Sequence, residues 1–387
     1  MPERPGAALD GIRILDLARL GPGPHSSQIL GDFGADIITV EPPPRRSGEL
    51  KLPRGAPIRR NSRSITLNLK SEAGREVFAK LVAASDVVVE GFRPGVAKRL
   101  GMDYEALCAI KSDIICVSLS GFGQDGPYSR VVGHDVNYQA MAGILHLTGD
   151  REGPPEIPGN AIADDAGGIA AALAITMALL VRERSGEGQH VDVAMLDTLL
   201  TMMLLNVDQW VDTGVSPRRG ETLLTGAYCF YNVYECKDGK YLSVGAIEPW
   251  FYANLCRRLG REDLIEDQRA TGAVQAERVQ TFRNIFLTKT RDQWVAELMH
   301  DDTCVAPVYA VDEVAADEHF RRRGSVVDAE DAAAGKRIQV GMLFKMSKTP
   351  GAIRRAPPEA GADTRDVLRE LGYDDRVIEA MAADGSL

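Results

Sequence analysis

The chain has few cysteines, and they form no recognisable pattern. Six occur among 387 residues, with no CxxC pair and no histidine at metal-ligand spacing. Scattered thiols of this kind fit a reduced cytoplasmic protein and argue against a disulfide framework or a structural zinc site. We therefore expect no metal. The six are Cys108, Cys116, Cys229, Cys236, Cys256 and Cys304.

The sequence also lacks an excess of positive charge and a long apolar segment. Its net charge is −10 at pH 7, which argues against a nucleic-acid or membrane-surface partner, so an anionic ligand would need a local cationic pocket. The N-terminus, MPERPGAALDG, has no apolar core of a signal peptide. The longest nearly apolar run, Ile169–Val181, is too short to span a bilayer. These features predict a soluble, cytoplasmic protein.

What the chain does contain is a regular alternation of strands and helices. Its length and its 44% of hydrophobic residues predict two domains. A helix is predicted over Glu72–Ala84, with Ser71 as N-cap and an apolar stripe through Val77 and Leu81. Strands that alternate with helices, without hairpin turns, predict an α/β fold with a mainly parallel sheet. The predicted strands are Ile12–Leu17, Asp36–Glu41, Ser64–Leu69, Asp86–Glu90 and Ile114–Leu119.

The loops after these strands are the predicted ligand site, because open parallel sheets bind ligands at the carboxyl ends of their strands. Most of these loops contain Gly or Pro, which lets backbone approach a ligand. Four of them supply cations to an acidic protein, which favours a phosphorylated ligand. For each cation alone, simple solvation of a loop explains the residue equally well. The cations are Arg19, Arg45 with Arg46, Lys70 and Arg93.

No standard phosphate motif supports this interpretation. There is no GxxxxGKS/T sequence, and GPGPHS differs from GxGxxG because of Pro24 and Ser26.

The second half of the chain changes in character. A Gly/Ala-rich core helix is predicted over Asp165–Val181, followed by the strand HVDVAM and a helix over Leu196–Gly214. From Thr225 onward, two strands flank a KDGK turn, which is a strong hairpin signal, and helices occupy Pro249–His300. These patterns predict a smaller α+β domain.

Three segments follow from these patterns. Residues 1–200 form most of a large ligand-binding domain, residues 225–315 form the small domain, and residues 330–387 return to the large domain as two short helices.

A histidine and two aspartates are candidates for proton transfer. His134, in GHDVNY, is one of only six histidines, and Asp164 and Asp165 open the core helix. Inverting a carbon next to a thioester needs a base on one face and an acid on the other, and an imidazole with a buried carboxylate can supply both. Amide groups of the first helical turn, with Gly167 and Gly168 allowing close approach, are predicted to stabilise the enolate oxygen. Local backbone bonding by His134 and N-capping by Asp164 stay open as alternatives.

The chain resembles the class III CoA-transferase (CaiB/BaiF-type) and racemase family along nearly its whole length, and its racemase branch most of all. GHDVNY and GAIEP are the most diagnostic of the stretches that carry the resemblance. The others are RLGPGPHSSQILGDFGADIITVE, LNLK, EGFRPGV, SGFGQDGP, NAIADDAGG, GEGQHVDVAMLD, DGKYLSVGAIEP, DTCVAPV and DVLRELGY.

The resemblance implies a Rossmann-like large domain, an intertwined homodimer and an acyl-CoA substrate, with no cofactor. It places the catalytic pair on His134 and Asp164, and the acid that orients the histidine on Glu248. The pattern has an arginine where this sequence has Pro42, so Arg45 or Arg46 is expected to substitute for it. The implied substrate-binding residues are Arg45, Leu67, Asn68, Leu69, Lys70, Arg93, Gly133, Asp135, Val136, Asn137 and Tyr138.

Three functions remain open at this point. The first is a racemase that inverts 2-methylacyl-CoA thioesters by two-base proton transfer. The second is a CoA-transferase in which Asp164 attacks the acyl-CoA and forms a covalent intermediate. The third is an acyl-CoA-binding protein without catalysis. His134 favours the first, since a transferase gives the histidine no required role. The sequence does not identify the acyl group or the pathway.

Overall fold

The computed structural model describes residues 6–43, 57–331 and 335–387. It divides into two compact units. The first comprises the chain up to Ala142, Asn160–Met202 and Glu318–Leu387, and the second comprises Gly143–Gly159 and Met203–Asp317. The range predicted for the small domain, 225–315, lies inside the second unit, and residues 335–387 lie inside the first.

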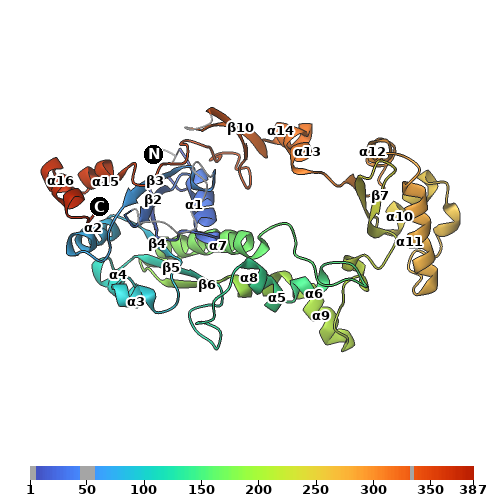
Figure 1. The fold of residues 1–387 in the computed structure, drawn as a ribbon, viewed down its shortest axis with the longest axis horizontal. Helices are drawn as coiled ribbons and strands as arrows, with labels where there is room; N and C mark the ends of the chain where they lie inside the picture. Colours follow the sequence, from blue (N-terminus) through green and yellow to red (C-terminus); the bar gives the residue numbers. More distant parts are fainter. Residues whose placement is uncertain (1–5, 44–56, 332–334) are drawn as a thin grey trace. The chain divides into compact units, whose positions relative to one another are not determined.

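The first unit is built on a six-stranded parallel sheet (Figure 1). Its order, β3-β2-β1-β4-β5-β6, is that of a Rossmann-like fold, with a reversal of direction between β1 and β4. The five predicted strands are confirmed, although the third begins and ends earlier than expected. The strands are β1 (Arg13–Asp16), β2 (Asp36–Glu41), β3 (Ser62–Thr66), β4 (Val87–Glu90), β5 (Ile115–Ser120) and β6 (His190–Ala194).

Helices cover both faces of this sheet. The predicted helix α2 is confirmed, and the Ser71 side chain caps it by accepting a hydrogen bond from the Gly74 amide at 3.0 Å. The helices of the first unit are α1 (Pro22–Asp32), α2 (Glu72–Ala83), α3 (Val96–Leu100), α4 (Tyr104–Ile110), α5 (Asp135–Met141), α7 (Ile162–Ser185), α8 (Met195–Met202), α14 (Glu318–Arg323), α15 (Thr364–Glu370) and α16 (Asp375–Ala383).

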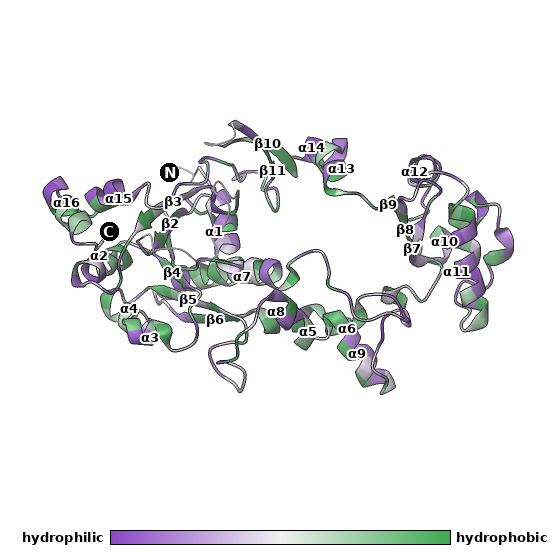
Figure 2. Cartoon of the chain, in the orientation of Figure 1, coloured by the Kyte–Doolittle hydropathy of each residue, from purple (hydrophilic) through white to green (hydrophobic). Residues whose placement is uncertain are grey.

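Strand side chains alternate between two cores, one on each face. Leu15 and Ile38 pack with α2, α4, α15 and α16, whereas Ile14 and Ile37 pack with α1 and α7. Figure 2 shows hydrophobic residues along these strands.

The core helix α7 is longer than predicted. It runs for 24 residues and has Ala161, not an aspartate, at its N-cap. It is the one helix in the described ranges with the length and composition to cross a membrane, yet its residues Ala171 and Ile175 are buried against the sheet. Length and composition are therefore weak grounds for a membrane assignment here.

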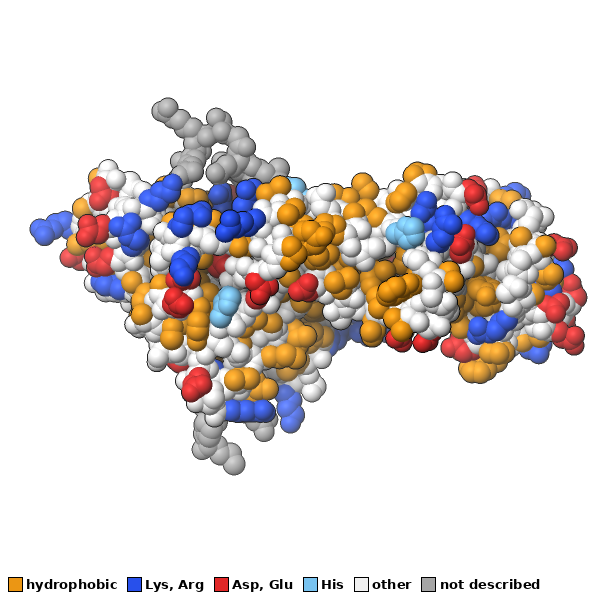
Figure 3. Space-filling model, turned by 90° about the horizontal axis from the view of Figure 1, so that it is seen from below, with side chains coloured by type: hydrophobic (Ala, Val, Ile, Leu, Met, Phe, Trp, Pro, Cys, Tyr) orange, Lys and Arg blue, Asp and Glu red, His pale blue; other side chains and the backbone are white. Residues whose placement is uncertain are grey.

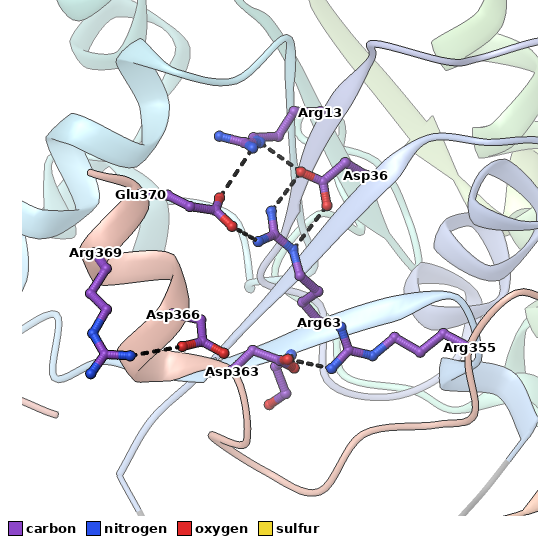
Figure 4. A network of polar contacts seen from close by, with 9 residues as sticks. Arg13, Asp36, Arg63, Arg355, Asp363, Asp366, Arg369 and Glu370 are labelled. Carbon is purple, nitrogen blue, oxygen red and sulfur yellow. Dashed lines mark hydrogen bonds and ion pairs between the residues drawn. The ribbon is translucent and has the colours of Figure 1, made fainter. Parts of the chain in front are cut away.

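The C-terminal helices are held on the sheet by apolar packing and by ion pairs (Figure 4). Arg63, on β3, contacts both Asp36 at 2.6 Å and Glu370 at 2.5 Å. The Asn68 amide donates to the Ser386 carbonyl at 2.8 Å. The predicted return of this segment to the large domain is thereby observed.

Two features depart from the sequence prediction. The segment predicted as one helix over Leu196–Gly214 is two helices, α8 and α9 (Leu204–Thr213), which meet at Met203 and belong to different units. A hairpin of β10 (Val326–Asp331) and β11 (Gly335–Val340) was not predicted. Arg60 anchors it, because its buried guanidinium binds Asp32 and donates to the Val340 carbonyl.

The second unit contains a three-stranded antiparallel sheet, of which the predicted hairpin forms two strands. The third strand, β9, was missed. The strands are β7 (Tyr231–Glu235), β8 (Tyr241–Gly245) and β9 (Val305–Pro307), and the remaining helices are α6 (Ile144–Leu147), α10 (Pro249–Arg258), α11 (Ala273–Phe286), α12 (Arg291–Leu298) and α13 (Val311–Ala316). Phe230, Phe282 and Trp294 form an aromatic core between sheet and helices.

Candidate active site

A cavity of about 850 Å³ lies at the carboxyl ends of the central strands. Its walls come from the chain that follows β1, β4 and β5, and they include Leu20, Phe92 and Phe122. Because the strand order reverses between β1 and β4, this is the switch point where open α/β sheets bind ligands.

Three arginines line the cavity, namely Arg93, Arg99 and Arg130. The sequence predicted Arg93 but not the other two. Arg130 lies within the loop between β5 and α5, and Arg99 lies one turn into α3. Counting the arginine within the loop after β5 would have found Arg130, and extending the search into the helix after β4 would have found Arg99. The cavity therefore has the cationic lining that an acidic protein needs for a phosphorylated ligand.

Of the other predicted cations, Arg19 and Lys70 are not among the residues that line this cavity. Lys70 is exposed and is not among the residues that line this cavity, because β3, which precedes it, is two strands away from the switch point. The Arg19 carbonyl accepts a hydrogen bond from Arg59 at 3.2 Å. Arg45 and Arg46 lie outside the described residues.

His134 occupies the N-cap position of α5 and lines the cavity. Its backbone N–H donates to the Asn137 side chain at 3.0 Å, so local capping uses the backbone of the histidine. Within the described ranges we find no hydrogen bond to the imidazole ring itself. The ring is therefore available to a ligand. The local bonding that was the predicted alternative role of His134 is made by its backbone N–H and not by its ring.

Asp164 lies in the first turn of α7 and is half-buried. Its carboxylate faces the loop after β1, where a Cβ placed on Gly21 would lie 3.4 Å from Asp164 Oδ1. Burial raises the pKa of Asp164, as do the neighbouring charges of Asp135 and Asp165, while His134 is near enough to lower it. A carboxyl with a raised pKa next to an imidazole is suited to accept and return a proton.

Asp135 connects the helix of His134 to the helix of Asp164. Its Oδ1 accepts hydrogen bonds from the Ala163 amide at 2.6 Å and from the Asp164 amide at 3.3 Å. These are the amides predicted to stabilise an enolate oxygen, so such an oxygen would compete with Asp135 for them. Asp135 was predicted only as a substrate contact, because its bond to α7 depends on tertiary structure.

Gly167 and Gly168 serve helix packing, contrary to the prediction that they admit a ligand. Both are buried, and a Cβ on Gly167 would lie 2.9 Å from Met195, while one on Gly168 would lie 2.9 Å from the His25 side chain.

Tyr138, on α5, packs against the loop that precedes this helix. Its hydroxyl donates to the Gly133 carbonyl at 2.7 Å, and its ring packs edge-on against Phe122. A Cβ on Gly121 would lie 2.4 Å from the Tyr138 hydroxyl oxygen, which explains the glycine there. Gly133, Asn137 and Tyr138 all line the cavity, and Val136 is half-buried in the first turn of α5.

The LNLK segment has a structural environment. The Leu67 side chain is buried in the core, and Leu69 packs against that core. The Asn68 side chain donates to the Gly385 carbonyl at 3.1 Å and accepts from the Lys70 amide at 3.2 Å. Any ligand contact of Leu67 would therefore be made by its backbone.

Glu248 belongs to the second unit, where it is the N-cap residue of α10. Its side chain makes no capping hydrogen bond. Burial of the Cys304 thiol raises its pKa, and the nearby charges of Glu248 and Asp302 raise it further. The pairing of Glu248 with His134 stays a prediction.

The first unit is an α/β protein with a Rossmann-like sheet and an arginine-lined cavity at its switch point. With an imidazole in the cavity wall and a raised-pKa carboxyl near that imidazole, the arrangement is suited to an anionic ligand next to acid–base groups. Comparison with known proteins identifies the family. The family described as CoA-transferase family III matches residues 9–364. The chain belongs to that family.

Two curated relatives show the range of the family. Alpha-methylacyl-CoA racemase of Homo sapiens is 35% identical over 392 residues, covering 98% of this chain and 100% of the relative. Succinyl-CoA--D-citramalate CoA-transferase of Chloroflexus aurantiacus is 32% identical over 386 residues and covers 95% of each. Among solved structures, a CAIB/BAIF family protein from Brucella suis superposes with a TM-score of 0.81 at 30% identity, covering 94% of this chain and 99% of the other.

Proposed function

We propose that this protein is an alpha-methylacyl-CoA racemase, which interconverts the (R) and (S) forms of 2-methylacyl-CoA thioesters. The observation that carries the proposal is the histidine at the cavity wall within electrostatic reach of a half-buried carboxyl whose pKa is raised. The similarity to racemases over nearly the whole chain supports it. The proposed reaction needs no cofactor, because CoA is part of the substrate. We also propose that the enzyme is cytoplasmic.

In this proposal the arginines of the cavity bind the CoA phosphates, and His134 and Asp164 flank the α-carbon. Asp164, ionised, removes the α-proton from one face, and the C–H electron pair moves into the enolate. Protonated His134 then delivers a proton to the other face, which inverts the centre. The reverse reaction exchanges the two roles, so each residue must be able to act as acid and as base.

Burial of Asp164 contributes to this chemistry. An exposed aspartate is too weak a base for an α-proton and too strong an acid to hold one at neutral pH. Burial moves the pKa of Asp164 toward that of an imidazole. The two groups on opposite faces of the α-carbon then differ less in proton affinity, so each can act as acid or as base. Glu248 is proposed to orient the imidazole of His134, as a hydrogen-bonded acid does in catalytic triads.

We also propose that the protein acts as an intertwined homodimer. Helix α7 exposes Leu173, Met177 and Leu180, each more than half exposed, and α8 exposes Leu200 and Met202. Figure 3 shows hydrophobic side chains exposed on the face that it draws. Several large exposed apolar side chains on two helices are typical of a surface that a partner covers.

A CoA-transferase is the second candidate, because several relatives carry that activity in their names. In that reaction the Asp164 carboxylate attacks the thioester carbonyl and forms a mixed anhydride, with release of CoA as a thiolate. The thiolate then attacks the Asp164 carbonyl of the anhydride, which expels the donor carboxylate and leaves an aspartyl-CoA thioester, and from this thioester CoA passes to the acceptor acid. His134 has no required role in these steps.

Incubation of one enantiomer of a 2-methylacyl-CoA in deuterium oxide separates the candidates. We expect α-deuteration and loss of optical purity without any added acid. The variant His134→Asn should no longer invert the centre, although Asp164 can still exchange the α-proton that faces it. The variant His300→Asn, at an exposed histidine of the second unit, should keep the racemisation. Inertness until a free carboxylic acid is added would favour the transferase. Binding of the acyl-CoA without turnover, both with and without an added acid, would indicate an acyl-CoA-binding protein without catalysis.

A further inference from the structure

Two buried carboxylates lie directly behind the walls of the cavity. Asp16 ends β1 and is 1% exposed, and Glu90 ends the neighbouring strand β4 and is 3% exposed. They lie on opposite faces of the sheet, because Asp16 continues the alternation that faces α1 and Glu90 the alternation that faces α2. Neither carboxylate itself lines the cavity.

Each carboxylate accepts a hydrogen bond from the backbone two residues after it, in the loop that follows its strand. Asp16 Oδ1 accepts a hydrogen bond from the Ala18 amide at 2.8 Å, and Glu90 Oε2 accepts one from the Phe92 amide at 2.6 Å. Ala18 and Phe92 both line the cavity, and Arg93 follows directly. The two bonds therefore fix the backbone on either side of the switch point.

The two loops also touch each other. A Cβ added to Gly91 would lie 3.4 Å from the Ala18 Cβ, and one added to Gly23 would lie 2.1 Å from it. Ala18 is thus held between the loop after β4 and the first turn of α1. A shift of either loop would move the other, so the width of the crevice depends on both carboxylates together.

Among the residues that the structure describes, no close ion pair neutralises either charge. Asp16 faces Ser27 of α1, with the charges of Arg59 and Glu41 nearby. Glu90 faces Ser118 of β5, with the Asp192 carboxylate and the Cys116 thiol nearby. Burial raises the pKa of both carboxyls, and that of Asp16 to about 6.

The His190 imidazole completes the surroundings of Glu90, because it contacts the Ser118 hydroxyl at 3.0 Å. Burying carboxylates under these conditions opposes folding, so a role in the cavity is the better explanation for them than stability.

We propose that Asp16 and Glu90 are positioning residues that hold the loops after β1 and β4 at the spacing that CoA requires, with Arg93 directed at its phosphates. This inference rests on the proposed binding of acyl-CoA. Because the carboxylates act on the binding walls and not on the reacting atoms, they govern KM far more than kcat.

The test measures the dissociation constant of free CoA for the full-length protein by titration calorimetry. Asp16→Leu and Glu90→Leu remove the acceptor, whereas Asp16→Asn and Glu90→Gln keep an oxygen in the same place. We expect each leucine variant to raise Kd and KM about tenfold, as the loss of one charge-assisted hydrogen bond predicts. The amide variants should rescue binding to within about threefold of wild type, and kcat should stay within about twofold in all four.

Asp363→Leu is the matched control. Asp363 is also a buried carboxylate that accepts from a backbone amide, that of Ser64 at 2.8 Å, but it does not line the cavity. Its loss should lower the melting temperature and leave Kd unchanged. If Glu90→Leu does not fold, Glu90→Asp takes its place, since it keeps the charge but is too short to reach the Phe92 amide, and Kd should rise in the same way.

The outcomes separate the two proposals. If wild-type protein does not bind CoA, the proposed function fails. If wild type binds CoA and the folded leucine variants bind it equally well, the positioning role is wrong and the proposed function stands. An equal loss of binding in Asp363→Leu would also overturn the positioning role, because the effect would then be one of general stability.

Discussion

Replacing Asp16 by asparagine should make the protein more stable at neutral pH. Burial raises the pKa of Asp16 from 3.8 to about 6. A group whose pKa is raised by folding contributes stability below its unfolded pKa and loses that contribution as pH rises through its folded pKa. Wild-type stability should therefore fall between about pH 4 and pH 6, where the folded state must give up a proton that the unfolded state has already lost.

The size of the effect follows from the shift. About two pKa units at 1.36 kcal/mol each give roughly 3 kcal/mol as an upper value, because the amide of asparagine is never charged but still accepts from Ala18. The variant should match wild type near pH 4 and exceed it by up to about 3 kcal/mol at pH 7.5. For a unit of this size, that difference corresponds to roughly 6 °C in melting temperature.

Thermal unfolding of both proteins at intervals from pH 4 to pH 8 measures the difference. A variant that is less stable than wild type at pH 7.5, by an amount that shrinks as the pH falls toward 4, would show that the ionised carboxylate stabilises the fold through Ala18 and Arg59. The reasoning from burial would then be wrong.

Three further perturbations have defined outcomes. Arg60→Ala leaves Asp32 buried without its ion pair and should lower the free energy of unfolding by about 3 kcal/mol or more, measured by denaturant titration. Ser71→Ala removes the cap of α2 and should lower the free energy of unfolding by about 1 kcal/mol in the same assay. An unchanged free energy of unfolding would mean that this cap does not stabilise the protein. Asp135→Asn removes a charge that raises the pKa of Asp164, so the acidic limb of the pH profile of kcat/KM should move to lower pH; an unmoved limb would mean that Asp164 does not set it.

The sheet of the first unit was predictable because its signals are local. Each strand is a short β-branched run, and the stripe through Val77 and Leu81 indicates one buried helix face whatever lies opposite. Their order in the sheet was not predictable. That order explains why Lys70 lies away from the cavity while Arg99 lines it.

The N-terminus of α7 shows where local reasoning ends. Two adjacent aspartates before an apolar run predict a cap, yet the helix begins at Ile162 and its free amides are bound by Asp135, from a helix that precedes it in the chain. The hairpin of β10 and β11 was missed for a related reason. Its exposed, charged residues carry little strand signal, and it is anchored through the distant Arg60.

The last residues of the chain complete the core beneath its first strands. Val367, Leu368, Ile378 and Met381 cover the face of the sheet that holds Leu15 and Ile38. During synthesis, that face stays open to water until α15 and α16 have been made, so the N-terminal strands emerge from the ribosome long before the helices that shield them. Folding of the first unit must therefore wait until α15 and α16 have left the ribosome, and a stop codon before residue 364 should yield an aggregating product and not a shorter enzyme.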